Sequence, residues 1–195
     1  MDPLIETVLK QLGGNALQEI AQKVGVDEET AQKAISVAAP LLLAALARNS
    51  STPAGAQALH QALTNDHDGS ILEDIVGFLT NPEAANGAGI LRHVLGDQQQ
   101  AVQSGLAQTA GLDAGSMGQI LEMAAPLIMG ALGQTTQQQG LDADGLSKLL
   151  KGQTQAEKQQ EPDLMGTIGQ LLGTGDTANV VSQVGSILGK LFGGR

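Results

Sequence analysis

Apolar residues recur along this chain three or four positions apart, the spacing of an α-helix, and no useful stretch alternates polar with apolar residues. The first such stripe is Leu4, Ile5, Val8, Leu9 and Leu12. The pattern therefore predicts an all-α protein. The predicted helices cover residues 4–12, 17–24, 27–48, 54–63, 70–79, 88–95, 98–110, 114–132 and 142–151. Most Gly residues are expected to end helices, as at positions 13, 25, 96, 111, 133, 140 and 152.

An internal repeat organises this pattern. When the chain is shifted by 86 positions, Ile20–Asn49 aligns without a gap with Leu106–Thr135, and ten of the thirty aligned pairs are identical. Self-similarity of this kind indicates repeated structural units. We therefore expect an internally duplicated bundle of short helices joined by Gly turns. Residues 1–86 form one helical unit, and residues 87–150 form a second unit that packs with the first as a single body.

Two further segments follow the repeat. Residues 151–163 are polar and Gln-rich without apolar periodicity, so we expect a linker. Beyond it, residues 164–195 are expected to form two amphipathic, Gly-rich helices. One face of the second helix carries five large apolar residues, namely Val184, Ile187, Leu188, Leu191 and Phe192.

This C-terminal apolar face has two open interpretations. In the first, it binds a protein partner or a second copy of the chain, with weak contact to a membrane surface as a further option. In the second, residues 164–195 fold back on the body as an incomplete third repeat.

Composition narrows the function classes. The chain has no Cys, which excludes a disulfide framework, a thiolate metal site and a cysteine nucleophile. Its aromatic residues are two Phe, with no Tyr or Trp, so it has no platform for stacking single-stranded nucleic acid. The formal charge of −10 opposes a phosphate backbone, and we expect no nucleic-acid partner.

We expect a cytoplasmic protein. The first residues lack the basic flank and apolar run of a signal peptide. The longest apolar stretch, Val37–Ala47, is shorter than the roughly 18 residues that cross a bilayer.

The segment Asp66 to Ser70 carries the most suggestive chemistry. Its Asp-x-Asp-Gly spacing is similar to part of a calcium loop, but an EF-hand would place Thr64 and Ile75 at ligand positions. Two interpretations remain. In the structural one, Asp68 or Ser70 caps a helix that starts near residue 71, and Gly69 is left-handed. In the functional one, His67, Asp68, Gly69 and Ser70 bind a metal or a small ligand, joined by His93.

Residues 66–96 and 121–133 resemble a bacterial family, domain of unknown function 937. The resemblance rests on His67-Asp68-Gly69-Ser70, on an Ala-Pro-containing apolar helix, and on a Gly-His-Val-Phe-Gly step. This chain departs from that step, with Arg92 in place of Gly and Leu95 in place of Phe. The resemblance implies an all-helical bacterial protein and supplies no activity.

No enzyme signature is present in the sequence. There is no Gly-x-Ser-x-Gly elbow, no P-loop and no dinucleotide fingerprint, so we expect no enzyme and no cofactor. The first hypothesis is a non-enzymatic interaction or scaffolding protein, and the alternative is a metal- or small-ligand-binding domain at the His67 segment. A DNA-binding regulator ranks third, because the best recognition segment, residues 28–35, begins with two Glu residues.

Overall fold

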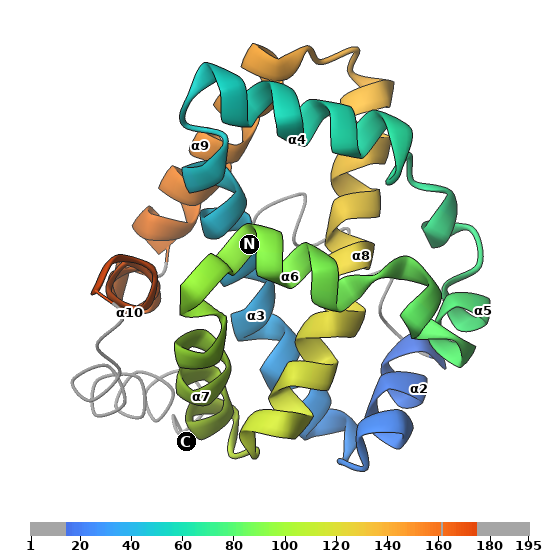
Figure 1. The fold of residues 1–195 in the computed structure, drawn as a ribbon. Coiled ribbons are helices and arrows are strands. Elements are labelled where there is room, and N and C mark those ends of the chain that lie inside the picture. Colours follow the sequence, from blue (N-terminus) through green and yellow to red (C-terminus); the bar gives the residue numbers. More distant parts are fainter. Residues whose placement is uncertain (1–14, 161, 175–195) are drawn as a thin grey trace.

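The computed structural model describes residues 15–160 and 162–174, and in these ranges the chain is helical with no strand (Figure 1). The all-α class is therefore confirmed. The predicted helices at 4–12 and in the distal C-terminal segment lie outside the described residues. In chain order the elements are α2 (Asn15–Val24), α3 (Glu28–Asn49), α4 (Pro53–Asn65), η1 (Ser70–Leu72), α5 (Ile75–Thr80), η2 (Pro82–Ala85), α6 (Gly87–Leu95), η3 (Gly96–Gln98), α7 (Gln99–Ala110), α8 (Ala114–Gln138), α9 (Ala143–Gln160) and α10 (Pro162–Thr174).

The core forms around α3 and α8, which pack on each other and on most of the remaining helices (Figure 1). Every residue from Val37 to Ala47 is buried, and so is every residue from Met123 to Gly133. A helix that is apolar on all sides has to be covered on all sides. Among the described helices, α3 alone has the length and apolar composition to cross a membrane, and 72% of its most apolar window is buried inside the fold.

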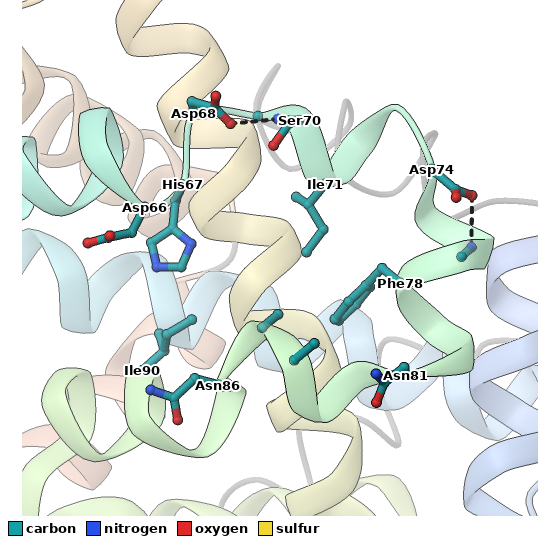
Figure 2. A pocket seen from close by; sticks show the side chains of 14 residues that line it. Asp66, His67, Asp68, Ser70, Ile71, Asp74, Phe78, Asn81, Asn86 and Ile90 are labelled. Carbon is teal, nitrogen blue, oxygen red and sulfur yellow. Dashed lines mark hydrogen bonds between the residues drawn. The ribbon is translucent and has the colours of Figure 1, made fainter.

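The predicted helix over residues 70–79 is wrong in one respect, because it is split in two. A single 3₁₀ turn, η1, ends at Leu72, and α5 begins at Ile75. The break is at Asp74, whose Oδ1 accepts a hydrogen bond of 2.8 Å from the backbone amide of Gly77 (Figure 2). Aspartate at such a position satisfies an amide that has no partner within the helix, so it starts a new helix instead of continuing the preceding one.

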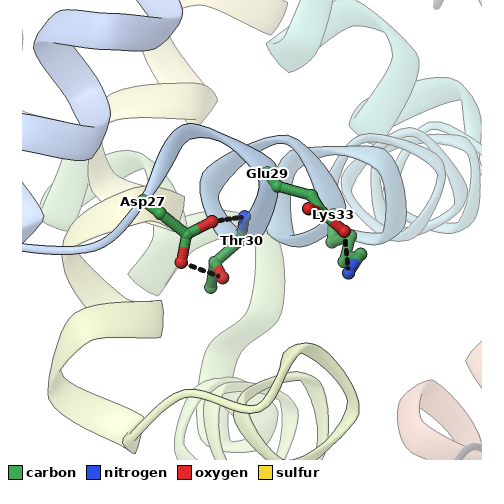
Figure 3. A network of polar contacts seen from close by, with 4 residues as sticks. All are labelled: Asp27, Glu29, Thr30 and Lys33. Atoms are coloured by element: carbon green, nitrogen blue, oxygen red, sulfur yellow. Dashed lines mark hydrogen bonds and ion pairs between the residues drawn. The ribbon is translucent and has the colours of Figure 1, made fainter.

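Both long core helices begin with the same cap. Asp27 accepts hydrogen bonds from the backbone amide of Thr30 at 2.8 Å and from its hydroxyl at 2.7 Å (Figure 3). Asp113, 86 positions later, accepts the same two bonds from Ser116 at 3.0 and 2.5 Å. The hydrogen bonds that the carboxylates accept from Thr30 and Ser116 lower the pKa of both aspartates. The shared cap is what the repeat predicts at this position, and the duplication as a whole stays a prediction.

Two of the glycines expected to end helices lie inside them instead. Gly133 lies within α8 and Gly152 within α9. By contrast, Gly25 and Gly111 follow α2 and α7 with φ of 76° and 74°, the left-handed conformation that ends a helix. At Gly133 the reason for a helical glycine is a close backbone contact, described below.

The expected linker is also corrected, because residues 151–160 are helical and complete α9. Gln, Lys, Glu and Ala are strong helix formers, and after Gly152 no residue of this stretch breaks a helix. The first half of α9 is anchored in the core by Leu146 and Leu150, so the polar second half only has to propagate an existing helix.

The described part of the C-terminal segment folds back on the body. Helix α10 contacts α9, α3 and α7, and it buries Ile168, Leu171 and Leu172. The side chains of Arg48 and Gln98 both donate to the Leu172 carbonyl, near the end of the helix. Residues 162–174 therefore follow the fold-back interpretation, whereas the face carrying Val184, Ile187, Leu188, Leu191 and Phe192 lies outside the described residues.

Candidate functional site

The His67 segment is an ordered turn between α4 and η1. Gly69 has a φ of 101°, the left-handed conformation predicted for it. Asp68 Oδ1 accepts a hydrogen bond of 3.0 Å from the backbone amide of Ser70. Hydrogen bonds from Ser70 lower the pKa of the Asp68 carboxyl. The predicted cap by Asp68 or Ser70 is wrong, because the N-cap residue of η1 is Gly69 and no side chain caps this helix. The Asp68 carboxylate instead closes a turn with the amide two residues further on.

Glycines dock this turn onto α8. A Cβ on Gly133 would overlap the carbonyl oxygen of His67, and a Cβ on Gly130 would lie 2.5 Å from Cγ2 of Ile71. Both contacts are closer than real Cβ atoms allow. At Gly133 the main chain of α8 approaches the main chain of the turn, and at Gly130 the missing side chain leaves room for the Ile71 side chain. Gln137 of α8 adds a hydrogen bond of 3.3 Å from its Nε2 to the Asp68 carbonyl. The position of His67 is therefore fixed by the core helix.

Helix α6 is held on the same core helix by similar means. A Cβ on Gly87 would overlap the carbonyl oxygen of Glu122, so α6 starts in backbone contact with α8. Leu91 and Val94 are buried beneath it. Asn49, at the end of α3, donates from Nδ2 to the Val94 carbonyl at 2.9 Å. The His67 turn and α6 thus both pack on α8, and they form two walls of the candidate site.

Two adjoining pockets lie between these walls, with His67, Asn86 and Ile90 lining both. Figure 2 shows the His67 ring pointing from the turn toward Ile90 of α6. The larger pocket, of about 870 Å³, is lined by three carboxylates, and we call it the acidic pocket. These carboxylates are Asp66, Asp68 and Asp74, and Figure 2 shows them together with the other side chains that line the pocket.

The smaller pocket, of about 480 Å³, lies between α3, α4, α6 and α8. Its apolar lining includes Leu46, Leu59, Ile90, Val94 and Met129, and its polar side chains are Asn49, His67, Asn86 and His93. Because two of these are imidazoles, we call it the histidine pocket. None of the described residues that line it is Asp, Glu, Lys or Arg, although the chain as a whole carries thirty such residues.

The histidine pocket brings together the two predicted site histidines. His67 comes from the His-Asp-Gly-Ser motif, and His93 and Val94 come from the second motif. His67 is half-buried, and its burial lowers the pKa of the imidazole, with the Asp66 carboxylate acting in the opposite direction. The remaining predicted residues, Asp68, Gly69 and Ser70, line the acidic pocket instead.

The arrangement favours ligand binding over metal binding. Within residues 15–160 and 162–174, no three His, Asp or Glu side chains gather closely enough to hold a metal ion. The histidine pocket offers imidazole and amide groups that donate and accept hydrogen bonds, set in an apolar wall. Such a wall with a few polar groups is typical of small-molecule sites.

Sequence reasoning missed Asn86, which lines both pockets at the start of α6. Asn86 adopts a left-handed conformation, with φ 51° and ψ 42°, directly before α6. The Asn86-Gly87 pair is a turn signal that the sequence already contains. The roles of Gly130 and Gly133 had no such signal, since a glycine that allows a tertiary contact looks the same in sequence as one that ends a helix.

Comparison with known proteins places this chain in a family. The sequence profile of the family described as bacterial protein of unknown function (DUF937) matches residues 6–135, so the chain belongs to this family. That range includes both motifs and every described residue that lines the histidine pocket. Searches of curated proteins and of solved structures gave no match.

Proposed function

We propose that this DUF937 protein is a non-enzymatic binding domain that takes a small molecule into the histidine pocket. The observation that carries the proposal is the convergence of His67 and His93, one from each family motif, on a single pocket free of charged side chains. If the His67 segment were only a structural turn between α4 and η1, it would not require an apolar pocket without charged residues next to it.

The size and lining of the pocket support this proposal. A volume of about 480 Å³ lies within the range of roughly 300–1,000 Å³ found for ligand sites. The apolar side chains would bury the body of the ligand, and the imidazole and amide groups would orient it.

The rigidity of the walls supports it as well. Both walls are docked on α8 through backbone contacts at Gly87 and Gly133. A site that is already formed loses little conformational entropy when it binds, so more of the contact energy appears as affinity.

Filling the pocket tests the proposal. Ala58 and Ala54 are both exposed alanines of α4, one turn apart, but only Ala58 lines the histidine pocket. We expect the uncharged dye Nile red to gain fluorescence with the wild-type chain and with Ala54→Phe, and to lose that gain with Ala58→Phe. Equal fluorescence with all three proteins, or none with the wild type, would contradict the proposal.

A further inference from the structure

Asn86 is the single non-glycine residue with positive φ in the described ranges. Asparagine tolerates this conformation better than most residues, and glycine adopts it without steric cost. Glycine at position 86 would therefore adopt the left-handed backbone conformation at least as well as asparagine does. What asparagine adds at this position is its side-chain carboxamide.

The carboxamide of Asn86 is not used as a helix cap. Asn86 is the N-cap residue of α6, yet its side chain makes no capping hydrogen bond. Gly89, one turn into the helix, leaves room for it, because a Cβ there would overlap Nδ2 of Asn86. The side chain is exposed and its donor and acceptor are available to a ligand.

Asn86 also lies at the junction of three pockets. It lines the acidic pocket, the histidine pocket and a third pocket of about 540 Å³ between α2, η2, α6 and α8. A ligand in the histidine pocket therefore meets this carboxamide at the edge shared with the acidic pocket.

The charges around the junction select for an uncharged ligand. Asp66, Asp68 and Asp74 line the adjoining acidic pocket and repel an anion. The same carboxylates attract a cation, but a cation that entered the histidine pocket would lose its hydration without contacting a carboxylate among the described residues that line it. A neutral molecule is not repelled and has no charge to desolvate.

We propose that the ligand is an uncharged, largely apolar molecule with one amide or hydroxyl group, and that Asn86 determines this specificity by hydrogen bonding to that group. The inference rests on the proposed function of the histidine pocket. The apolar body lies among the aliphatic side chains, and the polar group both donates to and accepts from the Asn86 carboxamide.

Three probes with one cyclohexane body test the charge selection: cyclohexanecarboxamide, cyclohexanecarboxylate and cyclohexylmethylammonium. Their binding to the full chain is followed by chemical-shift changes of His67, Asn86 and His93 in NMR titrations. The carboxamide is expected to bind most tightly and the carboxylate most weakly. Equal or tighter binding of either ion would overturn the inference.

The variant Asn86→Gly tests the role of the carboxamide. We expect it to weaken carboxamide binding by at least about fivefold, the factor that one of the two lost hydrogen bonds contributes, without lowering the melting temperature. Asn86→Asp, which also tolerates the left-handed backbone but loses the donor, is expected to weaken it as well. Unchanged affinity in both variants would overturn the role of Asn86. The Nile red experiment with Ala58→Phe does not depend on Asn86. Unchanged affinity in the Asn86 variants would therefore overturn the role of Asn86 without contradicting the proposed function of the histidine pocket.

Discussion

Gly133 of α8 lies against the main chain of the turn that carries His67, so closely that a Cβ on residue 133 would overlap the His67 carbonyl oxygen. This contact connects one of the two long core helices to the wall of the candidate site. It explains why a helix of the core carries a residue that weakens helices. The site and the core are therefore expected to respond to the same substitution.

The variant Gly133→Ala is expected to destabilise the protein by about 1–3 kcal/mol, the usual cost of overpacking. In a free helix the same change would stabilise by roughly 0.5–1 kcal/mol. Gly152→Ala is the matched control, because Gly152 lies inside α9 with no atom near its Cβ position. Urea unfolding measures both. If the two variants were stabilised alike, the close contact at Gly133 would be wrong.

The imidazole of His67 is expected to titrate below about pH 6.5, the ordinary histidine value, because burial lowers its pKa. An uncharged ligand in the histidine pocket excludes more water and is expected to lower the pKa further, whereas an anionic ligand would raise it. NMR titration of the imidazole nitrogens, with and without cyclohexanecarboxamide, measures both effects. A midpoint at or above the ordinary value in the free protein would contradict the burial.

The same pKa shift has a consequence for stability. Since the pKa of His67 is lower in the folded chain, the unfolded chain binds the proton first as the pH falls. The free energy of unfolding therefore decreases as the pH drops below about 6.5, and this decrease ends below the folded-state pKa. His67→Gln is expected to make that loss shallower in urea titrations between about pH 7 and pH 5. An unchanged pH dependence would contradict the linkage.

Two truncations separate α10 from the residues that follow it in the C-terminal segment. A chain ending at Gln160 loses α10 and is expected to melt at a lower temperature, because each large apolar side chain buried there contributes about 1.5–3 kcal/mol. A chain ending at Thr174 keeps Ile168, Leu171 and Leu172 in place and is expected to melt like the full chain.

The second truncation also tests the interaction proposed for Val184, Ile187, Leu188, Leu191 and Phe192. We expect the full chain to self-associate in sedimentation experiments and the chain ending at Thr174 to be monomeric. If the full chain is monomeric at every concentration, or both chains associate equally, self-association through this face is wrong.

The sequence was a good guide where structure is determined locally. Asp27 and Asp113 each stand two positions after a glycine that ends the preceding helix, and an aspartate in that place satisfies the first amides of the next helix whatever lies around it. The left-handed Gly69 was predictable for the same reason, since an Asp-Gly pair favours a turn on its own. Residues 151–160 were mispredicted because their polarity resembles a linker, while their helix propensity is high.

The pocket could not be predicted in the same way, because it depends on contacts between distant segments. His67 and His93 were both identified as candidates, but only the docking of the turn and α6 on α8 brings them to one pocket. That docking uses Gly87 and Gly133, whose partners are main-chain atoms far away in sequence. No local pattern distinguishes such a glycine from one that ends a helix.

The most direct test of the account is the identification of small molecules that the protein retains. The full chain, Ala54→Phe and Ala58→Phe are each incubated with a small-molecule extract of bacteria, separated from free compounds, and analysed by native mass spectrometry. We expect the wild type and Ala54→Phe to retain the same uncharged compound and Ala58→Phe not to retain it. Retention of the same compounds by all three proteins, or of none by the wild type, would contradict a binding function for the histidine pocket.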